Sequence, residues 1–320
     1  MKEIKTDELD PEEFIKEKVD EIRQKVGNKI AILALSGGVD SGTIARLGLM
    51  ALGHNQLKIF FIDNGLMRKD EPEWVFSTFS KEGIPVQIID AKKEFFAALK
   101  GITEPEAKRE AITQAFYKVV LPRLIRETDA EFLFHGTILT DIEETVAGIK
   151  RQHNILEQIG IDTEKEFGYK LVEPLKQLRK DGVRKVAETL RLPKSIWNRM
   201  PFPGPALAAR VIGEATPERI EIVRQATAIV EEELKRENAF QCMAILHNDK
   251  VTGIQKGKRE FGLQIEVRCW DSKDARTATP TKLPYDIIEK LVQRITTEVP
   301  SVVSVVENKT PKPPSTMEAI

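Results

Sequence analysis

Short apolar runs alternate with longer amphipathic segments over the first part of the chain. The segment that opens this pattern, Asp10-Pro11-Glu12-Glu13, has the N-cap residue, proline and acidic side chains of a helix start, and Gly27 is expected to end that helix. The alternation predicts an α/β domain in which a parallel sheet is wound with helices. The expected strands are Ile30–Leu35, Leu57–Asp63, Ile84–Asp90 and Glu131–His135.

The pattern changes after about Pro201. A segment rich in proline and glycine, Pro201–Pro205, precedes a long charged amphipathic segment, which we expect to form a helix from Pro217 to Arg236. A second helix is expected from Pro284 to about Val299, followed by a strand over Val302–Val306. This change of pattern predicts a first domain over residues 1–200 and a smaller α+β domain over residues 201–320.

Phe261–Cys269 is the clearest strand pattern in the second half, because every second residue is apolar. Such alternation predicts a strand with one face packed against the domain core. The other face would then direct Gln264, Glu266 and Arg268 outward.

A six-residue loop, Ser36-Gly37-Gly38-Val39-Asp40-Ser41, joins the first expected strand to a helix that begins near Val39. The adjacent glycines let backbone N–H groups approach phosphate oxygens, and the helix directs its positive end at them. The hydroxyls of Ser36 and Ser41 can add donors, and Asp40 can hold Mg²⁺. The loop lacks the Gly-Lys-Ser/Thr of a Walker A motif, so it favours release of pyrophosphate over γ-phosphoryl transfer. A strand-to-helix turn without a ligand is the alternative.

Two further polar pairs, Asp63-Asn64 and Gly136-Thr137, follow expected strands. Parallel sheets bind ligands at the carboxyl ends of their strands, so both pairs are expected beside Ser36–Ser41. Together the three segments predict a nucleotide site. Asp-Asn-Gly is also a common turn sequence, and Gly136, Thr137 and the nearby Asp141 fit a helix cap when each is taken alone.

Composition narrows the possible partners. The 320 residues carry 49 Lys and Arg against 50 Asp and Glu, so the net charge of −1 provides no general attraction to nucleic acid or to a membrane surface. The N-terminal residues lack a signal-peptide pattern and no apolar stretch is long enough to span a bilayer, which predicts a cytoplasmic protein. Cys242 and Cys269 are the only cysteines, and their spacing favours small core residues or a reduced pair over a zinc site.

The loop Ser36–Ser41 resembles the pyrophosphatase loop of N-type ATP pyrophosphatases, and the rest of the chain is similar to the synthetase part of GMP synthetase. The similarity extends over nearly all of the chain beyond the first helix. It implies an adenine nucleotide α-hydrolase-like fold followed by a dimerisation domain. The matching segments include Phe61–Arg68, Gly101–Arg109, Gly136–Asp141, Leu171–Leu175, Pro201–Arg210, Leu283–Asp286 and Lys312–Glu318.

In the GMP synthetase family, ATP adenylylates the 2-oxygen of xanthosine monophosphate, pyrophosphate leaves, and ammonia displaces AMP to give GMP. The resemblance therefore implies ATP and Mg²⁺ as cofactors, xanthosine monophosphate as the substrate, and a homodimer. No glutaminase domain is found in the sequence, so a separate glutaminase subunit is expected to supply the ammonia.

The resemblance also implies roles for particular residues. Asp40 and Asp141 are implied to hold the metal, and Lys150, His153 and Asp40 to take part in catalysis. ATP-binding roles are implied for Ser36, Gly37, Gly38, Val39, Asp40, Ser41, Asp63, Asn64, Gly136 and Thr137. Roles in binding the substrate nucleotide are implied for Arg109, Gln255, Lys312 and Glu318. For Arg109 a solvated surface arginine is the alternative, and for the Lys309–Pro314 tail a disordered proline-rich segment is the alternative.

Lys150 and His153 begin a segment that resembles a mobile lid, whose positive charge would stabilise the reacting α-phosphate. His153 as an ordinary loop histidine is the alternative. After Asn154 the paired glycines of the family lid are absent, and Ser304 stands where the family has an arginine. These departures leave two other hypotheses open: a paralogue that adenylylates a different purine or related acceptor, and a nucleotide-binding homologue without turnover.

Overall fold

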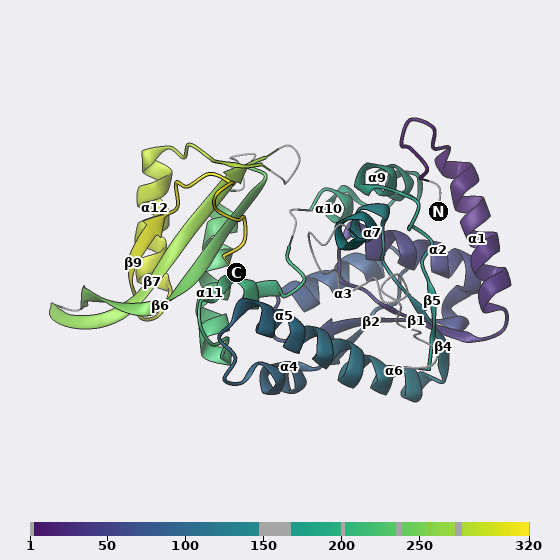
Figure 1. The fold of residues 1–320 in the computed structure, drawn as a ribbon, viewed down its shortest axis with the longest axis horizontal. Helices are drawn as coiled ribbons and strands as arrows, with labels where there is room; N and C mark the ends of the chain where they lie inside the picture. Colours follow the sequence, from purple (N-terminus) through teal and green to yellow (C-terminus); the bar gives the residue numbers. More distant parts are fainter. Residues whose placement is uncertain are drawn as a thin grey trace. The chain divides into compact units, whose positions relative to one another are not determined.

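The computed structural model describes residues 3–146, 168–199, 202–234, 239–255, 257–272 and 277–319. The chain forms two compact units, and Figure 1 labels most of their helices and strands. The first unit comprises Met1–Asp63, Pro72–Ala91 and Phe116–Arg199, and the second comprises Asn64–Glu71, Lys92–Ala115 and Met200–Ile320. The second unit thus includes two segments that the expected boundary at residue 200 leaves in the first domain.

The first unit contains a five-stranded parallel sheet in the order β3-β2-β1-β4-β5. The predicted α/β fold class is therefore confirmed. The central strands are almost entirely apolar because both faces of a parallel sheet are covered. The strand β5 was not predicted, since three residues are too few to show a periodic pattern. The strands are β1 (Ile30–Ala34), β2 (Leu57–Asp63), β3 (Gln87–Asp90), β4 (Ala130–Phe134) and β5 (Lys170–Val172).

The first helix of the first unit, α1, begins and ends where its local sequence signals place it. In α1 the side chain of Asp10 accepts hydrogen bonds from the backbone N–H groups of Glu12 and Glu13, and Gly27 follows the last turn with φ +60°. No helix in the described part of the chain is long and apolar enough to cross a membrane. The described helices are α1 (Pro11–Val26), α2 (Val39–Gln56), α3 (Glu71–Lys81), the π-helix η1 (Ala115–Val120), α6 (Leu121–Thr128), α7 (Leu139–Val146), α9 (Lys180–Thr189) and α10 (Lys194–Trp197).

The second unit is built on a long antiparallel hairpin formed by β6 (Gln241–Gln255) and β7 (Lys258–Asp271). Two short strands, β8 (Thr279–Pro280) and β9 (Val302–Glu307), pair with β7 to complete a mixed sheet. This architecture confirms the predicted smaller α+β unit. Its helices are α4 (Lys92–Leu99), α5 (Pro105–Gln114), the 3-10 helix η3 (Ala206–Arg210), α11 (Pro217–Glu233) and α12 (Tyr285–Glu298).

The prediction that Glu266 and Arg268 face outward is wrong, because both side chains are buried. Arg268 Nη1 donates to the backbone carbonyls of Thr316, Met317 and Glu318, so the C-terminal segment covers this face of β7. Burial alone would raise the pKa of Glu266, but hydrogen bonds from Asn308, Arg268 and His247 lower it below its ordinary value. The alternation of the strand was predicted correctly. The face that was expected to be exposed is instead covered by the C-terminal segment.

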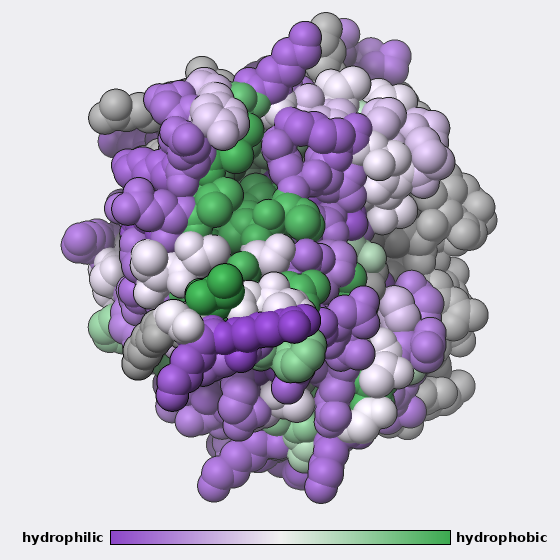
Figure 2. Space-filling view, turned by 90° about the vertical axis from the view of Figure 1, so that its left-hand side faces the viewer, coloured by the Kyte–Doolittle hydropathy of each residue, from purple (hydrophilic) through white to green (hydrophobic). Residues whose placement is uncertain are grey.

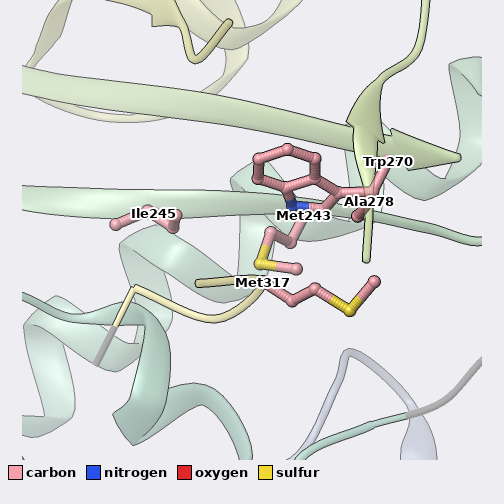
Figure 3. Packing of buried hydrophobic residues seen from close by; sticks show 5 residues of the cluster. All are labelled: Met243, Ile245, Trp270, Ala278 and Met317. Carbon is pink, nitrogen blue, oxygen red and sulfur yellow. The ribbon is translucent and has the colours of Figure 1, made fainter. Parts of the chain in front are cut away.

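The C-terminal segment is ordered against this sheet, as the strand before it and the motif after it suggested. Met317 packs into a cluster with Met243, Ile245 and Trp270, and its side chain lies beneath the strands in Figure 3. Ala278 completes the cluster and exchanges two backbone hydrogen bonds with Lys312. These contacts favour an ordered tail over the disordered alternative.

A close fit between strands occurs where β9 meets the hairpin. The register of β7 and β9 shifts so that Leu263 pairs with Val302 and Gln264 with Ser304, which leaves Val303 as a bulged residue. A Cβ added at Gly253 or Gly262 would lie 2.5 or 2.4 Å from side-chain atoms of Val303. Only glycine at these two positions leaves room for the valine.

The two cysteines are buried free thiols and lie directly opposite each other, since Cys242 on β6 pairs in register with Cys269 on β7. This arrangement fits the expectation of small core residues or a reduced pair.

Candidate active site

The loop Ser36–Ser41 follows β1 and is organised by its own hydroxyl groups. Ser41 Oγ donates to the carbonyl of Gly38 at 3.1 Å and accepts from the backbone N–H of Ser36 at 3.2 Å. The two serine hydroxyls are 3.0 Å apart, and the Gly38 N–H lies 3.4 Å from Ser36 Oγ. Gly38 is the N-cap residue of α2, so the positive end of that helix starts within the loop. This geometry is compatible with phosphate binding, and the ATP-binding role of the loop stays a prediction.

Asp40 lies on the first turn of α2 and is only partly satisfied by hydrogen bonds. Its Oδ2 accepts from Nζ of Lys180 at 2.5 Å. Its Oδ1 is buried, and no described residue donates a hydrogen bond to it. A buried carboxylate oxygen without a donor is costly unless a cation or another donor occupies that position, so Asp40 fits the role of a metal ligand.

The ends of β1 and β4 meet at Asp40. A Cβ added at Gly136 would lie 3.7 Å from Cβ of Asp40, so the segment after β4 contacts the first turn of α2. Asp63 ends the neighbouring strand β2 and is buried. The structure thus brings the predicted ATP-binding residues of the first unit to one edge of the sheet, as the strand-end rule predicted.

Two cations near this loop were not identified from the sequence. One is Lys180, through its contact with Asp40, and the other is Arg199. The Arg199 guanidinium stacks on the ring of Trp74 at 4.1 Å, and its Nη1 would be 3.4 Å from a Cβ at Gly37. Each lies far along the chain from the residue it contacts, so no local motif marks it. Both place positive charge beside the loop, where phosphate groups would bind.

Asn64 and Asp141 both accept local backbone hydrogen bonds. Asn64 Oδ1 accepts from the N–H of Leu66 at 2.9 Å, which is the turn interaction that its sequence context suggested. Asp141 Oδ2 accepts from the N–H of Ile138 at 3.1 Å, at the start of α7. These bonds match the structural alternatives, and the ligand roles of both residues stay predictions.

His135 directly follows β4 and lies in a cluster of buried polar groups. Its ring nitrogens are 2.9 Å from Tyr117 Oη and 3.1 Å from Thr137 Oγ1, and Thr137 in turn donates to Glu173 Oε1 at 2.6 Å. Burial lowers the pKa of His135 to about 4, although the charge of Glu173 acts in the opposite direction. Of the four, only Thr137 was predicted as a site residue.

In the second unit, Glu318 lies among polar groups from several segments. It accepts from Gln241 Nε2 at 2.7 Å and from Nε of Arg210 at 3.3 Å. Arg210 is fully buried, its guanidinium lies 4.9 Å from the ring centroid of Phe202, and no described residue accepts a hydrogen bond from its Nη1. The sequence assigned no site role to Arg210 or Gln241, although Arg210 closes a recognised motif.

Arg109 also belongs to the second unit, and a contact of the preceding residue on α5, Lys108, fixes its position. Lys108 is buried and donates to the carbonyl of Val211 at 2.6 Å, next to Arg210. Burial, together with the nearby charge of Arg219, lowers the pKa of Lys108 to about 8. Arg109 itself forms an ion pair with Glu106 one turn earlier, at 3.4 Å. The Lys108 contact therefore fixes the helix that carries Arg109.

Gln255 lies at the other end of β6 from the polar groups around Glu318. Its backbone forms the last pair of the hairpin, with Lys258, whereas Gln241 begins the strand. Fifteen residues of strand extend on the order of 40 Å. Within one chain, Gln255 and Glu318 therefore cannot contact the same nucleotide, which corrects the expectation that they share one site.

Lys150 and His153 lie outside the described residues. Ser304 is described, and its hydroxyl accepts from Gln264 Nε2 at 3.0 Å. Among the described residues, no group of three or more His, Cys, Asp or Glu side chains is arranged to hold a metal. A metal would therefore need ligands from its nucleotide or from water besides one or two carboxylates.

A phosphate-binding loop without a Walker lysine, at the carboxyl end of a parallel sheet, defines the class of nucleotide-binding α/β proteins to which ATP pyrophosphatases belong. Residues 10–121 match the family model of NAD synthase, and residues 228–319 match that of the GMP synthase C terminal domain. The structure also has a weak similarity to NMN synthetase from Francisella tularensis, with a TM-score of 0.48 and 15% identity over 62% of this chain and 78% of that one.

Curated relatives match over almost their whole length. They are the subunits designated B of glutamine-hydrolyzing GMP synthase. The relative from Archaeoglobus fulgidus is 46% identical, covering 97% of this chain and 99% of the relative. Those from Pyrococcus abyssi and Methanopyrus kandleri are 46% and 43% identical, covering 96% and 97% of this chain and 98% and 99% of the relatives. The chain belongs to this family of GMP synthase subunits, which confirms the resemblance found in the sequence.

Proposed function

We propose that the chain is the synthetase subunit of a two-subunit GMP synthase. It would use ATP to adenylylate the 2-oxygen of xanthosine monophosphate, release pyrophosphate, and let ammonia displace AMP to give GMP. The observation that carries the proposal is the preformed loop Ser36–Ser41 with the partly unsatisfied carboxylate of Asp40 beside it. Membership in the family of GMP synthase subunits supports the choice of acceptor.

In this mechanism the loop binds the β- and γ-phosphates through its backbone N–H groups and the positive end of α2. Asp40, with Asp141, would hold Mg²⁺, which supplies charge that favours departure of pyrophosphate. Lys180 contacts Asp40 and Arg199 lies beside Gly37, so both can donate to phosphate oxygens. These groups stabilise the leaving group and leave the α-phosphorus accessible to the attacking oxygen.

The substrate nucleotide would be held by Arg109, Lys312 and Glu318 of the second unit. Glu318 already shares its carboxylate with Arg210 and Gln241, which fixes its orientation before a ligand binds. Lys150 and His153 would supply charge at the reacting phosphate. Gln255 is too distant to join this group within one chain, so its role would require a second copy.

A glutaminase subunit would supply ammonia, in keeping with the name of the relatives. A homodimer through the second unit is also part of the proposal, and Figure 2 shows hydrophobic surface on the side of the molecule where α12 and β9 lie. Ile254 and Phe261, near the hairpin tip, are 77% and 71% exposed, which suits burial against a second copy. The cytoplasmic location expected from the sequence stays a prediction.

The test is incubation of the purified chain with Mg-ATP, an ammonium salt and xanthosine monophosphate, followed by measurement of AMP, pyrophosphate and GMP. Stoichiometric formation of all three, lost in Asp40→Ala, is the expected result. Asp20→Ala on the exposed face of α1 is the matched control. Pyrophosphate release only with another purine would identify a paralogue, and no adenylylation of any purine nucleotide would refute the enzymatic assignment.

A further inference from the structure

The hydrogen-bonded cluster around His135 joins three separate elements of the first unit. Tyr117 lies on η1, His135 and Thr137 lie in the segment directly after β4, and Glu173 follows β5. Tyr117, Thr137 and Glu173 are 7%, 0% and 8% exposed. A cluster of several buried polar groups keeps a defined geometry only when each group has a hydrogen-bond partner within the cluster.

The direction of each hydrogen bond follows from the available protons. A threonine hydroxyl has one hydrogen, and Thr137 donates it to Glu173. The Thr137 oxygen must then accept from His135, which places the imidazole proton on Nδ1. A neutral ring leaves Nε2 as an acceptor, and it receives the Tyr117 hydroxyl proton. The chain of donors runs from Tyr117 through His135 and Thr137 to Glu173.

This arrangement has a consequence for the predicted ATP site. The hydroxyl proton of Thr137 is committed to Glu173, so it is not offered to a nucleotide. Gly136, which contacts Asp40, has no side chain to fix its own position and depends on its neighbours. The backbone N–H of His135 donates to the carbonyl of Val172, and the side-chain bonds to Glu173 and Tyr117 hold the segment on either side of that contact.

We propose that Glu173, His135 and Tyr117 are positioning residues, which hold the Gly136–Thr137 backbone in place for ATP through the buried Thr137 side chain. The backbone of Thr137 would then contact the nucleotide, and its hydroxyl would form hydrogen bonds only inside the protein. The proposal rests on the proposed function, because it concerns the ATP site of that reaction.

The kinetic test compares variants that break the hydrogen bonds at different distances from the predicted ligand. Thr137→Val and Tyr117→Phe are each expected to raise KM for ATP, by about tenfold and about threefold, while kcat and KM for xanthosine monophosphate stay close to wild type. Glu173→Gln retains an acceptor for Thr137 and is expected to recover most of the ATP affinity that Glu173→Ala loses. Tyr169→Phe removes another buried tyrosine hydroxyl outside the four-residue chain and is the matched control.

A second measurement does not depend on turnover. The chain has four histidines, so nitrogen-15 labelling of histidine gives a spectrum in which His135 can be assigned by its loss in His135→Asn. His135 is expected to be the Nδ1–H tautomer with a slowly exchanging proton, and that proton is expected to exchange rapidly in Thr137→Val.

An Nε2–H tautomer in the wild type would overturn the proposal. It would also be overturned by loss of ATP affinity in Thr137→Val with unchanged affinity in Tyr117→Phe and Glu173→Ala, since that result makes the hydroxyl a direct ligand. A wild-type chain that binds ATP but forms no GMP would instead refute the proposed function. In that case the dissociation constants for ATP of the same variants are compared in place of their KM values. That comparison then tests whether Glu173, His135 and Tyr117 act as positioning residues.

Discussion

Replacing Gly37 with alanine is expected to destabilise the phosphate loop, whereas the same change at Gly38 is expected to be tolerated. Gly37 has φ +81°, a conformation that costs a non-glycine residue about 1–2 kcal/mol. A new Cβ there would lie 2.8 Å from Cγ2 of Val75, a buried β-branched side chain on α3 that has few alternative rotamers. Overpacking of this kind costs about 1–3 kcal/mol, so the total is about 3 kcal/mol.

Gly38 provides the matched control within the same loop. Its φ of −84° suits any residue, and a Cβ would lie 3.5 Å from Ser36 Oγ, which is an ordinary contact. Because Gly38 is the N-cap residue of α2 and alanine is a poorer N-cap than glycine, the expected loss in the free energy of unfolding is about 0.5–1 kcal/mol, well below that at Gly37.

Urea unfolding followed by circular dichroism measures the difference between the two variants. A lower midpoint in Gly37→Ala at unchanged slope, together with a higher KM for ATP, is the expected result. Equal midpoints for the two variants would refute the argument from backbone conformation and contact distance.

Three further predictions concern stability. Burial lowers the pKa of His135 to about 4 from an ordinary 6.5, so the contribution of the neutral ring to stability is fully present above pH 6.5 and is lost as pH falls towards 4. Relative to His135→Asn, the wild-type free energy of unfolding should fall by about 3 kcal/mol over that interval, as measured by urea unfolding at each pH. Parallel pH curves for the two proteins would contradict this prediction. The pKa of Lys108 is lowered to about 8 from 10.5, so the folded protein binds fewer protons than the unfolded chain between these pH values. The wild-type free energy of unfolding, relative to that of Lys108→Met, should therefore rise by about 3 kcal/mol between pH 8 and 10.5. A difference between the two proteins that does not change with pH would show that the amine is solvated. Gly253→Ala should lose about 1–3 kcal/mol against Val303, whose own Cβ would lie 2.5 Å from the new Cβ. Val303→Gly, which removes that Cβ, should cost less in the Gly253→Ala background than in the wild type; an additive double-mutant cycle would exclude the steric contact.

Much of the fold was predictable because its signals are local. A strand, a helix cap or a phosphate-binding turn is specified by residues within a few positions of one another, as Asp10 at the start of α1 and Gly37-Gly38 before α2 illustrate. The strand-end rule then placed Gly136 beside Asp40 without knowledge of any side-chain contact.

The sequence alone therefore predicted four of the five strands of the parallel sheet, the loop and, through its motifs, the family. The tertiary structure decided which distant side chains complete each group: Lys180 at Asp40, Glu173 at Thr137, and the C-terminal tail over Arg268. The physical reason is that hydrophobic periodicity reports only which face of an element is apolar. It carries no information about which distant polar group satisfies a buried charge, because that pairing depends on how the elements pack.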